Sequence, residues 1–366
     1  MPKKQIPLLL LLLAALLARA SAAPEYQPPA LSDPQSWSMI LIPDTQSYVK
    51  SARNQPLLEH MTAWVADNTE RLNIKMVLCT GDLVEYNEMP NPPGLQTPGS
   101  KRADQPGKRQ WESVARSFGR LDGVVPYITT TGNHDYGHGR GGSQNRRTHF
   151  PEYFPVDKNP LNLKHIRDAG LNAAGIPTLE NASYEFTLPG GRGLLVVALE
   201  FAPRDSAVEW AKSVVNNKKY ENHTVFLLTH SYLSDKSEHF ATEDYELTDT
   251  NYGAAIFEKL VRPSRNIQMV FSGHIAAPDD IRAHLAFRTD KNAAGKTVHQ
   301  MAFNAQALGG GWSGNGGDGW LRILEFLPDG KTVKVKTFST LFASSPATRH
   351  LAWRTASHDE FVLTLD

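Results

Sequence analysis

The chain has 366 residues, of which 40% are hydrophobic and 21% are charged. This length allows one large domain or two small ones, and the hydrophobic fraction is sufficient for a substantial core, so the composition does not indicate disorder. The 38 lysines and arginines balance the 38 aspartates and glutamates. A chain without net positive charge gives no evidence for binding a nucleic-acid polymer, and any recognition of an anion must come from a local group of basic residues. Cys79 is the single cysteine, so no intramolecular disulfide can form.

Residues 1–23 have the pattern of a secretory signal peptide. Two lysines precede a leucine-rich stretch over residues 8–17, and small residues end the segment. We therefore expect a secreted or periplasmic protein with no membrane span after cleavage; the alternative is an uncleaved anchor, which usually needs about 20 apolar residues. Residues 24–37, rich in proline and serine, are expected to be a linker before a folded domain over residues 38–366.

Five largely apolar runs each lead into a residue type that binds metals. The runs and the residues after them are 39–42 with Asp44, 74–80 with Asp82, 126–131 with Asn133, 224–229 with His230, and 267–272 with His274. Continuous apolar runs are typical of strands buried on both faces. Because the functional crevice of an open α/β sheet lies beyond the carboxyl ends of its strands, we expect these five side chains to converge.

The remaining periodicities predict an α/β fold. Helical spacing of apolar residues predicts helices over 55–71, 111–121, 206–217 and 252–261, and strand-like runs occupy 283–289, 297–304, 320–327, 332–338 and 361–365. The polar, proline-rich residues 86–110 are expected to form a long surface loop that shapes access to the crevice. Together these elements predict two β-sheets packed face to face with helices outside.

The strand-end motifs resemble those of the calcineurin-like metallophosphoesterases, whose series runs D-x-H, G-D-x-x-D, G-N-H-D/E, a strand-end histidine and G-H-x-H. The resemblance spans roughly residues 38–340. This chain departs from the pattern at Gln46, Glu85 and Ala276, and it is similar to a secreted bacterial subset with P-D-T-Q and a later G-D-G-W-L-R stretch. The resemblance implies a four-layer αββα sandwich of two mixed β-sheets flanked by helices.

The resemblance also implies two divalent metal ions. One tight ion would take the side chains of Asp82, Asn133, His230 and His274, and a weaker ion would take Asp44, Asp82 and the amide oxygen of Gln46. Mixed oxygen and imidazole ligands suit Mn, Fe or Zn. The loss of imidazole at positions 46 and 276 makes Mg a further candidate for the weaker site.

Other residues are expected to act on the substrate. His134 resembles the family's transition-state histidine, and Asp135 is expected to hold its other ring nitrogen. Arg140, Arg146 and Arg147 could bind a second phosphate or an anionic leaving group, or they could form a solvated basic loop. In the glycine-rich stretch that ends at residue 320, Trp312 could stack on a sugar or base, or the stretch could be a mobile connection. Asn304 and Gln306, near the end of a preceding strand, could each contribute an amide at or next to the metal ions.

The preferred hypothesis is an exported metal-dependent phosphoesterase that hydrolyses a small phosphomonoester or phosphodiester by metal-activated water. The alternative is a metal-binding scaffold or binding protein of the same fold that is catalytically impaired. Two residues, Gln46 and Ala276, favour the alternative. The enzyme is favoured by the five intact motif residues Asn133, His134, Asp135, His230 and His274. The sequence does not indicate the substrate or the oligomeric state.

Overall fold

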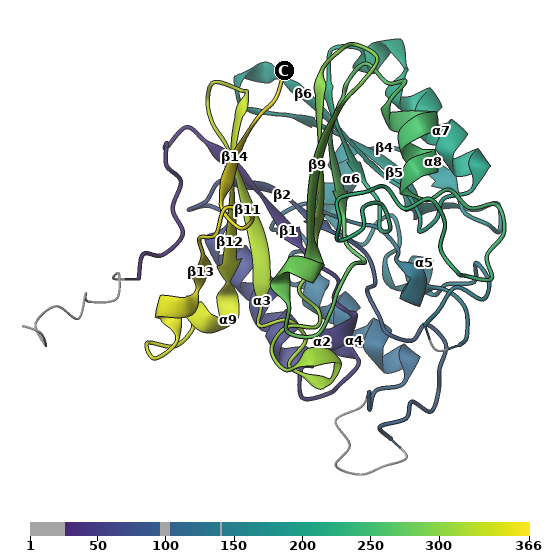
Figure 1. The fold of residues 1–366 in the computed structure, drawn as a ribbon, viewed down its shortest axis with the longest axis vertical. Helices are drawn as coiled ribbons and strands as arrows, with labels where there is room; N and C mark the ends of the chain where they lie inside the picture. The colour runs from purple at the N-terminus through teal and green to yellow at the C-terminus, as the bar shows by residue number, and fades with distance from the viewer. Residues whose placement is uncertain (1–25, 96–102, 140) are drawn as a thin grey trace, which may run out of the picture.

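The computed structural model describes residues 26–95, 103–139 and 141–366, and within them two seven-stranded sheets face each other (Figure 1). Sheet A runs in the spatial order β13 (Trp353–Arg354), β12 (Thr332–Ser339), β11 (Trp320–Phe326), β1 (Trp37–Ile42), β2 (Ile74–Cys79) and β3 (Tyr127–Thr129), and β14 (Phe361–Thr364) pairs with β12. Sheet B runs in the order β4 (Ile166–Leu171), β5 (Pro177–Thr187), β6 (Gly193–Ala198), β7 (Thr224–Leu228), β8 (Ile267–Ser272), β10 (Thr297–Phe303) and β9 (Leu285–Lys291).

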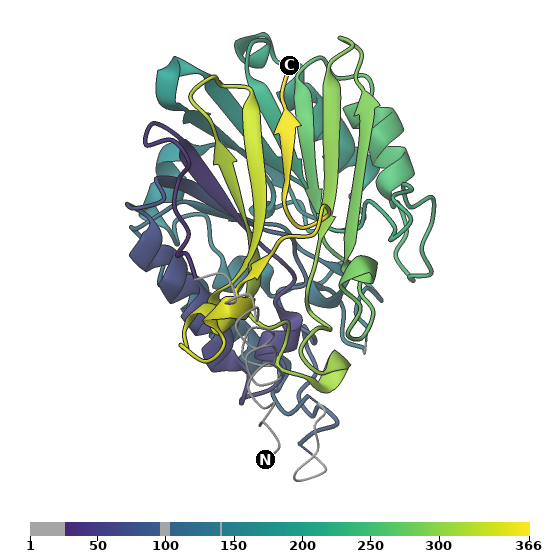
Figure 2. The same cartoon turned by 60° about the vertical axis from the view of Figure 1, so that its left-hand side comes forward.

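Both sheets are mixed, and each contains a parallel block. In sheet A, β1, β2 and β3 are parallel, whereas β11 and β12 join antiparallel. In sheet B, β6, β7, β8 and β10 are parallel, whereas β4, β5 and β9 are antiparallel. The C-terminal β14 pairs with β12 at the side of sheet A that lies next to sheet B (Figure 2). The ring of Phe361 on this strand contacts that of Phe287 on β9.

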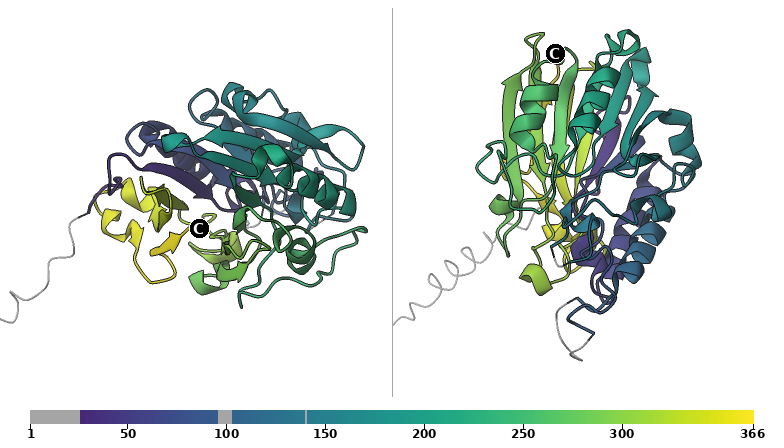
Figure 3. Two further views of the ribbon diagram at one scale, coloured as in Figure 1. Left: turned by 90° about the horizontal axis from the view of Figure 1, so that it is seen from above. Right: turned by 90° about the vertical axis from the view of Figure 1, so that its right-hand side faces the viewer.

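Helices cover the outer faces of the sheets (Figure 3). The longer ones are α3 (Gln55–Asn68), α4 (Gly107–Gly119), α7 (Asp205–Val215), and α8 (Gly253–Ile256), which continues as the π-helix η4 (Phe257–Val261). The short ones are α2 (Gln46–Val49), α5 (Phe150–Tyr153), α6 (Pro160–His165), α9 (Thr340–Ala343), η1 (Asn133–Asp135), η2 (Pro189–Gly191), η3 (Lys218–Tyr220), η5 (Ile281–His284), η6 (Gly311–Ser313) and η7 (Arg349–Leu351). In the part of the chain that the structure describes, no helix has the length and hydrophobicity needed to cross a bilayer.

The alternation of side chains along β6 shows how the layers are held together. Leu194, Val196 and Ala198 belong to the core between the sheets, whereas Leu195 and Val197 pack with the residues of α7 and η4. A strand covered on both faces must be apolar at every position, which is why the run reads as continuous hydrophobic sequence. The predicted four-layer αββα sandwich is confirmed.

The predicted elements differ from the structure mainly at their ends. The predicted loop over 86–110 is shorter, because α4 begins at Gly107, and the predicted helix over 252–261 changes from α to π geometry at Phe257. The sequence analysis did not anticipate β4, β5 and β6, which extend sheet B beyond β7. The predicted signal peptide lies outside the described residues.

Candidate metal centre

Six strands deliver polar side chains to one edge of the two sheets. Asp44 follows β1, Asp82 follows β2, Asn133 follows β3, His230 follows β7, His274 follows β8, and Asn304 follows β10. The strands within each block are parallel, so their carboxyl ends lie at the same edge. The first three residues come from sheet A and the last three from sheet B, so the site lies where the two sheets meet.

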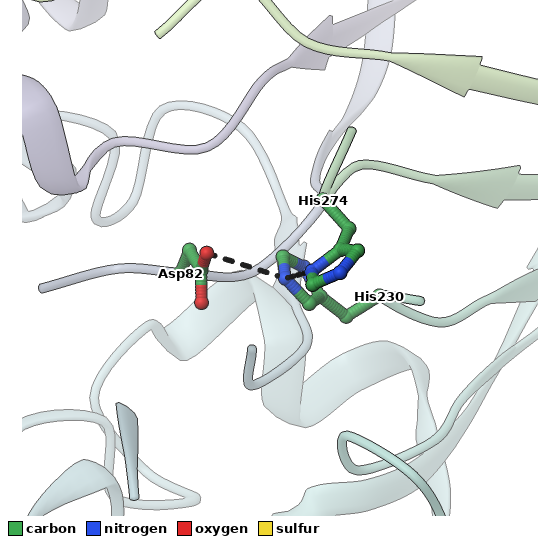
Figure 4. A group of neighbouring side chains, drawn as sticks. All are labelled: Asp82, His230 and His274. Atoms are coloured by element: carbon green, nitrogen blue, oxygen red, sulfur yellow. Dashed lines mark hydrogen bonds and ion pairs between the residues drawn. The ribbon is translucent and has the colours of Figure 1, made fainter. Parts of the chain in front are cut away.

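Four of these side chains form a tight cluster, which we call the four-residue cluster: Asp82, Asn133, His230 and His274. The Nε2 atom of His230 lies 3.3 Å from Asp82 Oδ2 and 3.2 Å from His274 Nδ1 (Figure 4). The Oδ1 atom of Asn133 lies 3.3 Å from His230 Nε2 and 3.1 Å from His274 Nδ1. One carboxylate, one amide oxygen and two imidazole nitrogens therefore converge, and this donor set fits Mn, Fe or Zn.

In His230 and His274, the ring nitrogen that points away from the cluster also has a hydrogen-bond partner. The Nδ1 atom of His230 lies 2.7 Å from the carbonyl oxygen of Thr80, and the Nε2 atom of His274 lies 2.6 Å from Oε1 of Glu243. Partners of this kind orient the rings of metal-binding histidines. The sequence analysis missed Glu243, because it lies in a polar loop that contains several acidic residues and no motif.

Glycines let the strand-end loops approach each other. A Cβ atom at Gly132 would lie 2.7 Å from Asp82 Cγ, and one at Gly273 would lie 2.7 Å from the hydroxyl oxygen of Thr80. Real Cβ atoms essentially never come this close to another heavy atom. The glycines of the motifs are therefore required by close packing between neighbouring loops rather than by contact with a ligand.

The carboxylate of Asp44 is surrounded by donors. Its Oδ1 accepts a hydrogen bond of 2.7 Å from the Thr80 hydroxyl, and its Oδ2 accepts from Asn304 Nδ2 at 2.6 Å and Gln306 Nε2 at 3.4 Å. The backbone N–H of His274 also donates to Oδ2, at 3.0 Å. The two candidate amides of the sequence analysis thus contact Asp44, both through their nitrogens.

Gln46, which stands where the family has a histidine, is buried beside Asp82. Its Nε2 donates to Asp82 Oδ2 at 3.0 Å. Its Oε1 is buried and has no hydrogen-bond partner among the described residues. A buried acceptor without a partner is unfavourable, so this oxygen fits a role as a ligand of a cation next to Asp82.

The electrostatic field of the centre favours positive charge. Burial raises the pKa of Asp44 to about 6. Burial alone would lower the pKa of His230, but the charges of Asp82 and Asp44 outweigh it and raise that pKa to about 10. Burial would raise the pKa of Asp82, yet the neighbouring His230 and His134 hold it well below its usual range. The negative charges of Asp82 and Asp44, which stabilise a proton on His230, would also stabilise a divalent cation.

His134 lies at the wall of the adjoining cavity and is fixed by its own loop. Its backbone N–H donates to Asp82 Oδ1 at 3.0 Å, and its Nδ1–H donates to the carbonyl oxygen of Glu85 at 2.9 Å. Glu85 thus acts through its backbone here, and its carboxylate pairs with Lys50 at 3.3 Å. Glu85 is also among the residues that line the adjoining cavity.

The expectation that Asp135 holds the ring of His134 is wrong, because the ring nitrogen Nδ1 is held by the carbonyl oxygen of Glu85. The carboxylate of Asp135 instead accepts three backbone hydrogen bonds, from the N–H groups of Gly132 at 2.7 Å, Val84 at 3.0 Å and Leu83 at 3.1 Å. Burial raises the pKa of Asp135 to about 7. The role of Asp135 is therefore to join the loops after β2 and β3, which indirectly positions Asp82 and His134.

The four-residue cluster opens into a cavity of about 510 Å³. Its lining includes Asp82, Asn133, His134 and His274, together with Gln46, Lys50, Glu85, Tyr86, Pro93, Ala103, Gly141, Tyr245, Gln306, Trp312 and Ser313. Trp312 is 46% exposed, so its ring is available at the mouth of the cavity. The structure thus brings Trp312 to the site, as the stacking hypothesis requires.

Two of the three candidate arginines, Arg146 and Arg147, are not brought to the cavity. Arg146 donates to the carbonyl oxygens of Phe201 at 3.2 Å and Ala202 at 2.8 Å, so its guanidinium is engaged with backbone oxygens after β6. Arg147 is exposed and pairs with Glu88 at 3.3 Å. Neither is among the described residues that line the cavity, which corrects the expectation that they bind substrate. Arg140 lies outside the described residues.

A comparison with known protein families agrees with this geometry. A family model described as calcineurin-like phosphoesterase matches residues 38–278. The uncharacterized protein YvnB of Bacillus subtilis (strain 168) is 28% identical over 311 residues; the match covers 83% of this chain but 20% of that protein, so this chain spans about one fifth of the relative's length.

Two solved structures align over most of the chain. The GAP50 anchor of the inner membrane complex of Plasmodium aligns with a TM-score of 0.43 and 11% identity, covering 90% of this chain and 89% of that one. PhoD aligns with a TM-score of 0.44 and 12% identity, covering 93% of this chain and 72% of that one. The family model matches well over half of the residues, so this protein belongs to the calcineurin-like phosphoesterase family.

Proposed function

We propose that the protein uses bound divalent metal to hydrolyse a phosphomonoester or phosphodiester of a small molecule. Family membership supports the general class, a phosphoric ester hydrolase. The observation that carries the proposal is the convergence of two imidazoles, an amide oxygen and a carboxylate at the base of a cavity of about 510 Å³. A cavity of this size takes a small ester rather than a folded polymer.

The four-residue cluster would hold the tighter ion, with Mn, Fe or Zn as candidates. Asp44, Asp82 and the unpartnered Oε1 of Gln46 would hold a weaker ion, for which Mg is also a candidate. When bound, the ions supply a water that ionises near neutral pH and neutralise charge on the phosphoryl oxygens. Ala276, which stands where the family has a histidine, supports the difference in affinity, because its side chain has no ligand atom.

His134 is the proposed proton donor to the leaving-group oxygen. Its Nδ1–H is engaged with the carbonyl oxygen of Glu85, which leaves Nε2 as the donor. Burial alone would lower the pKa of His134, but the charges of Asp82 and Glu85 outweigh it and raise the pKa. The doubly protonated ring, which can donate from Nε2, is thereby favoured. Trp312 is the proposed stacking surface for the organic part of the ester.

A metal-binding protein without catalytic activity is the second candidate. The observation that favours it is at Asp44, whose carboxylate already accepts hydrogen bonds from three side chains and one backbone N–H. A carboxylate satisfied in this way has less capacity left for an ion. This candidate predicts binding of one ion and no hydrolysis.

Hydrolysis of p-nitrophenyl phosphate and bis(p-nitrophenyl) phosphate tests the two candidates. The purified protein is stripped with chelator, and Mn²⁺ is added back, with His134→Ala as the control variant. Metal-dependent release of p-nitrophenol that falls sharply in a variant still carrying Mn²⁺ supports the enzyme. Mn²⁺ binding with no hydrolysis of either ester supports the second candidate. If Mn, Fe and Zn all fail to bind the folded protein, both candidates are overturned.

Export is a further part of the proposal, and it rests on the order of charged, apolar and small residues over 1–23. Expression of the whole sequence in a bacterial host, followed by N-terminal sequencing of the exported protein, is the test. The expected first residue lies just after position 22 or 23. An exported product that begins at Met1 would overturn it.

A further inference from the structure

The loop over residues 231–252, between β7 and α8, contacts the metal centre from outside the motifs. Glu243 in this loop is largely buried, with 11% of its side chain exposed. Its Oε1 lies 2.6 Å from Nε2 of His274, and its Oε2 accepts a hydrogen bond from the hydroxyl of Ser231. Both carboxylate oxygens are therefore engaged, and the carboxylate faces His274 in one orientation.

This contact determines which nitrogen of His274 can bind a cation. A carboxylate accepts hydrogen bonds, so the proton of a neutral ring must lie on Nε2, and the lone pair then lies on Nδ1. That Nδ1 is the atom that faces the four-residue cluster, 3.1 Å from Asn133 Oδ1 and 3.2 Å from His230 Nε2. The opposite tautomer would direct an N–H at the cluster and would exclude an ion.

His230 has the opposite arrangement and needs no such residue. Its Nδ1–H donates to the carbonyl oxygen of Thr80, part of the backbone after β2, and its Nε2 faces the cluster. The two histidines thus present different nitrogens to one point. The partner of His230 is fixed by sheet A, whereas the partner of His274 is a side chain on a separate loop, so only the latter can be removed by substitution.

We propose that Glu243 is a positioning residue for the metal centre: it fixes the tautomer and ring orientation of His274 so that Nδ1 can bind the ion. This inference rests on the proposed metal-dependent function. The same loop places Tyr245 in the cavity lining and packs the ring of Phe240 edge-on to His274, at 5.7 Å between centroids. Ion binding is thereby linked to the order of the loop that forms one wall of the substrate cavity.

Titration calorimetry with Mn²⁺ tests the proposal on the metal-stripped whole protein. Glu243→Ala removes the acceptor, and Glu243→Gln keeps an acceptor oxygen but removes the charge. The matched control is Glu246→Gln, which removes the same charge from an exposed position of the same loop. We expect the Kd to rise by about 10- to 100-fold for Glu243→Ala, the usual effect of losing such a partner, and by less for Glu243→Gln. Glu246→Gln is expected to stay within about twofold, since exposed charges are screened.

Two further readouts separate positioning from a general loss of structure. Nitrogen-15 spectra of the metal-free proteins are expected to show His274 with its proton on Nε2 in the unaltered chain and to lose this state in Glu243→Ala. Hydrogen exchange of the loop over 231–252 is expected to slow on adding Mn²⁺ in the unaltered chain and to slow less in Glu243→Ala. Thermal unfolding without metal reports whether the variant folds; if Glu243→Ala does not, Glu243→Gln carries the test.

The proposal is overturned if the folded Glu243 variants bind Mn²⁺ with the unaltered Kd and keep the Nε2–H tautomer. His230→Ala distinguishes this failure from that of the proposed function. If the unaltered chain binds Mn²⁺ and His230→Ala does not, the metal centre stands whatever Glu243 does. If the unaltered chain binds no Mn²⁺, the metal-dependent function itself fails, and the inference fails with it.

Discussion

Substitution of Gly273 by alanine tests the packing of the metal centre directly. Gly273 lies between β8 and His274, and the added methyl group would overlap Oδ1 of Asp44 and lie 2.7 Å from Oγ1 and 2.9 Å from Cβ of Thr80. Asp44 and Thr80 are both fully buried, so neither side chain can move into solvent. The carboxylate of Asp44 must shift away from the donors that surround it.

The size of the effect follows from two contributions. Inserting a methyl group into a closely packed interior costs about 1–3 kcal/mol. The displaced carboxylate also weakens its hydrogen bonds with Thr80 and Asn304, and a bond to a charged group contributes about 1.5–3 kcal/mol. Because the bonds are weakened rather than all lost, we expect the free energy of unfolding to fall by about 2–5 kcal/mol.

Urea unfolding of the metal-free protein measures this loss, and Gly119→Ala is the matched control. Gly119 lies at the end of α4, and the nearest atom to an added Cβ is Asp122 Oδ2 at an ordinary 3.6 Å. Removing a glycine from a compatible helical position changes stability by at most about 1 kcal/mol, usually favourably. If Gly273→Ala unfolds like the unaltered chain and binds Mn²⁺ equally well, the steric account of the motif glycines is wrong.

Three further predictions concern the proton donor, the weaker ion and a surface charge cluster. His134→Ala should keep its Mn²⁺ but lower turnover by about 10²- to 10⁴-fold. The loss should be larger for phenyl phosphate than for p-nitrophenyl phosphate, because phenol is the poorer leaving group and has more need of the proton. Equal rate losses for the two esters, or near-native rates, would exclude His134 as the acid. Ala276→His should supply a missing ligand and shift the curve of hydrolysis rate against free Mn²⁺ to lower concentration, and coincident curves for two folded proteins would refute the unequal sites. Burial alone would raise the pKa of Glu185, but hydrogen bonds from Lys219 and Arg167 outweigh it and lower the pKa to about 2. Glu185→Gln should therefore lower the free energy of unfolding in urea by about 1 kcal/mol at pH 7. The difference in stability between the two proteins should vanish as the pH falls from about 4.5 to 2, whereas a difference that stays constant with pH would show that the lost stability is not electrostatic.

The parts of the site that could be predicted from the sequence are those encoded locally. An apolar run followed by Asp82 or His230 gives both the strand and the side chain at its end, and parallel pairing then brings such ends together. The same argument gives the direction of approach but not which ring nitrogen faces the cluster. That choice depends on the partner of the outer nitrogen, Thr80 for one histidine and Glu243 for the other.

The parts that could not be predicted depend on loop conformation and on contacts distant in sequence. The neighbour of His134 in the sequence, Asp135, was an obvious candidate to hold its ring, yet the tight turn directs that carboxylate to backbone N–H groups instead. Arg146 has the residue type of a phosphate ligand, but its loop folds toward the backbone after β6. Strands β4 to β6 were missed because they carry no ligand residue, although β6 is a clear apolar run.

The meeting of the two sheets at the metal centre has a consequence for folding. Asp82 and Asn133 belong to one sheet and His230 and His274 to the other, so an ion held by all four cross-links the two halves of the sandwich. At a concentration 100-fold above its Kd, a ligand specific to the native state adds about 2.7 kcal/mol to stability, and here that free energy resists separation of the sheets. The core between them, including the Phe226 and Phe326 rings 5.8 Å apart, therefore influences metal affinity from a distance, since any repacking that changes how the sheets dock also changes the spacing of the ligands.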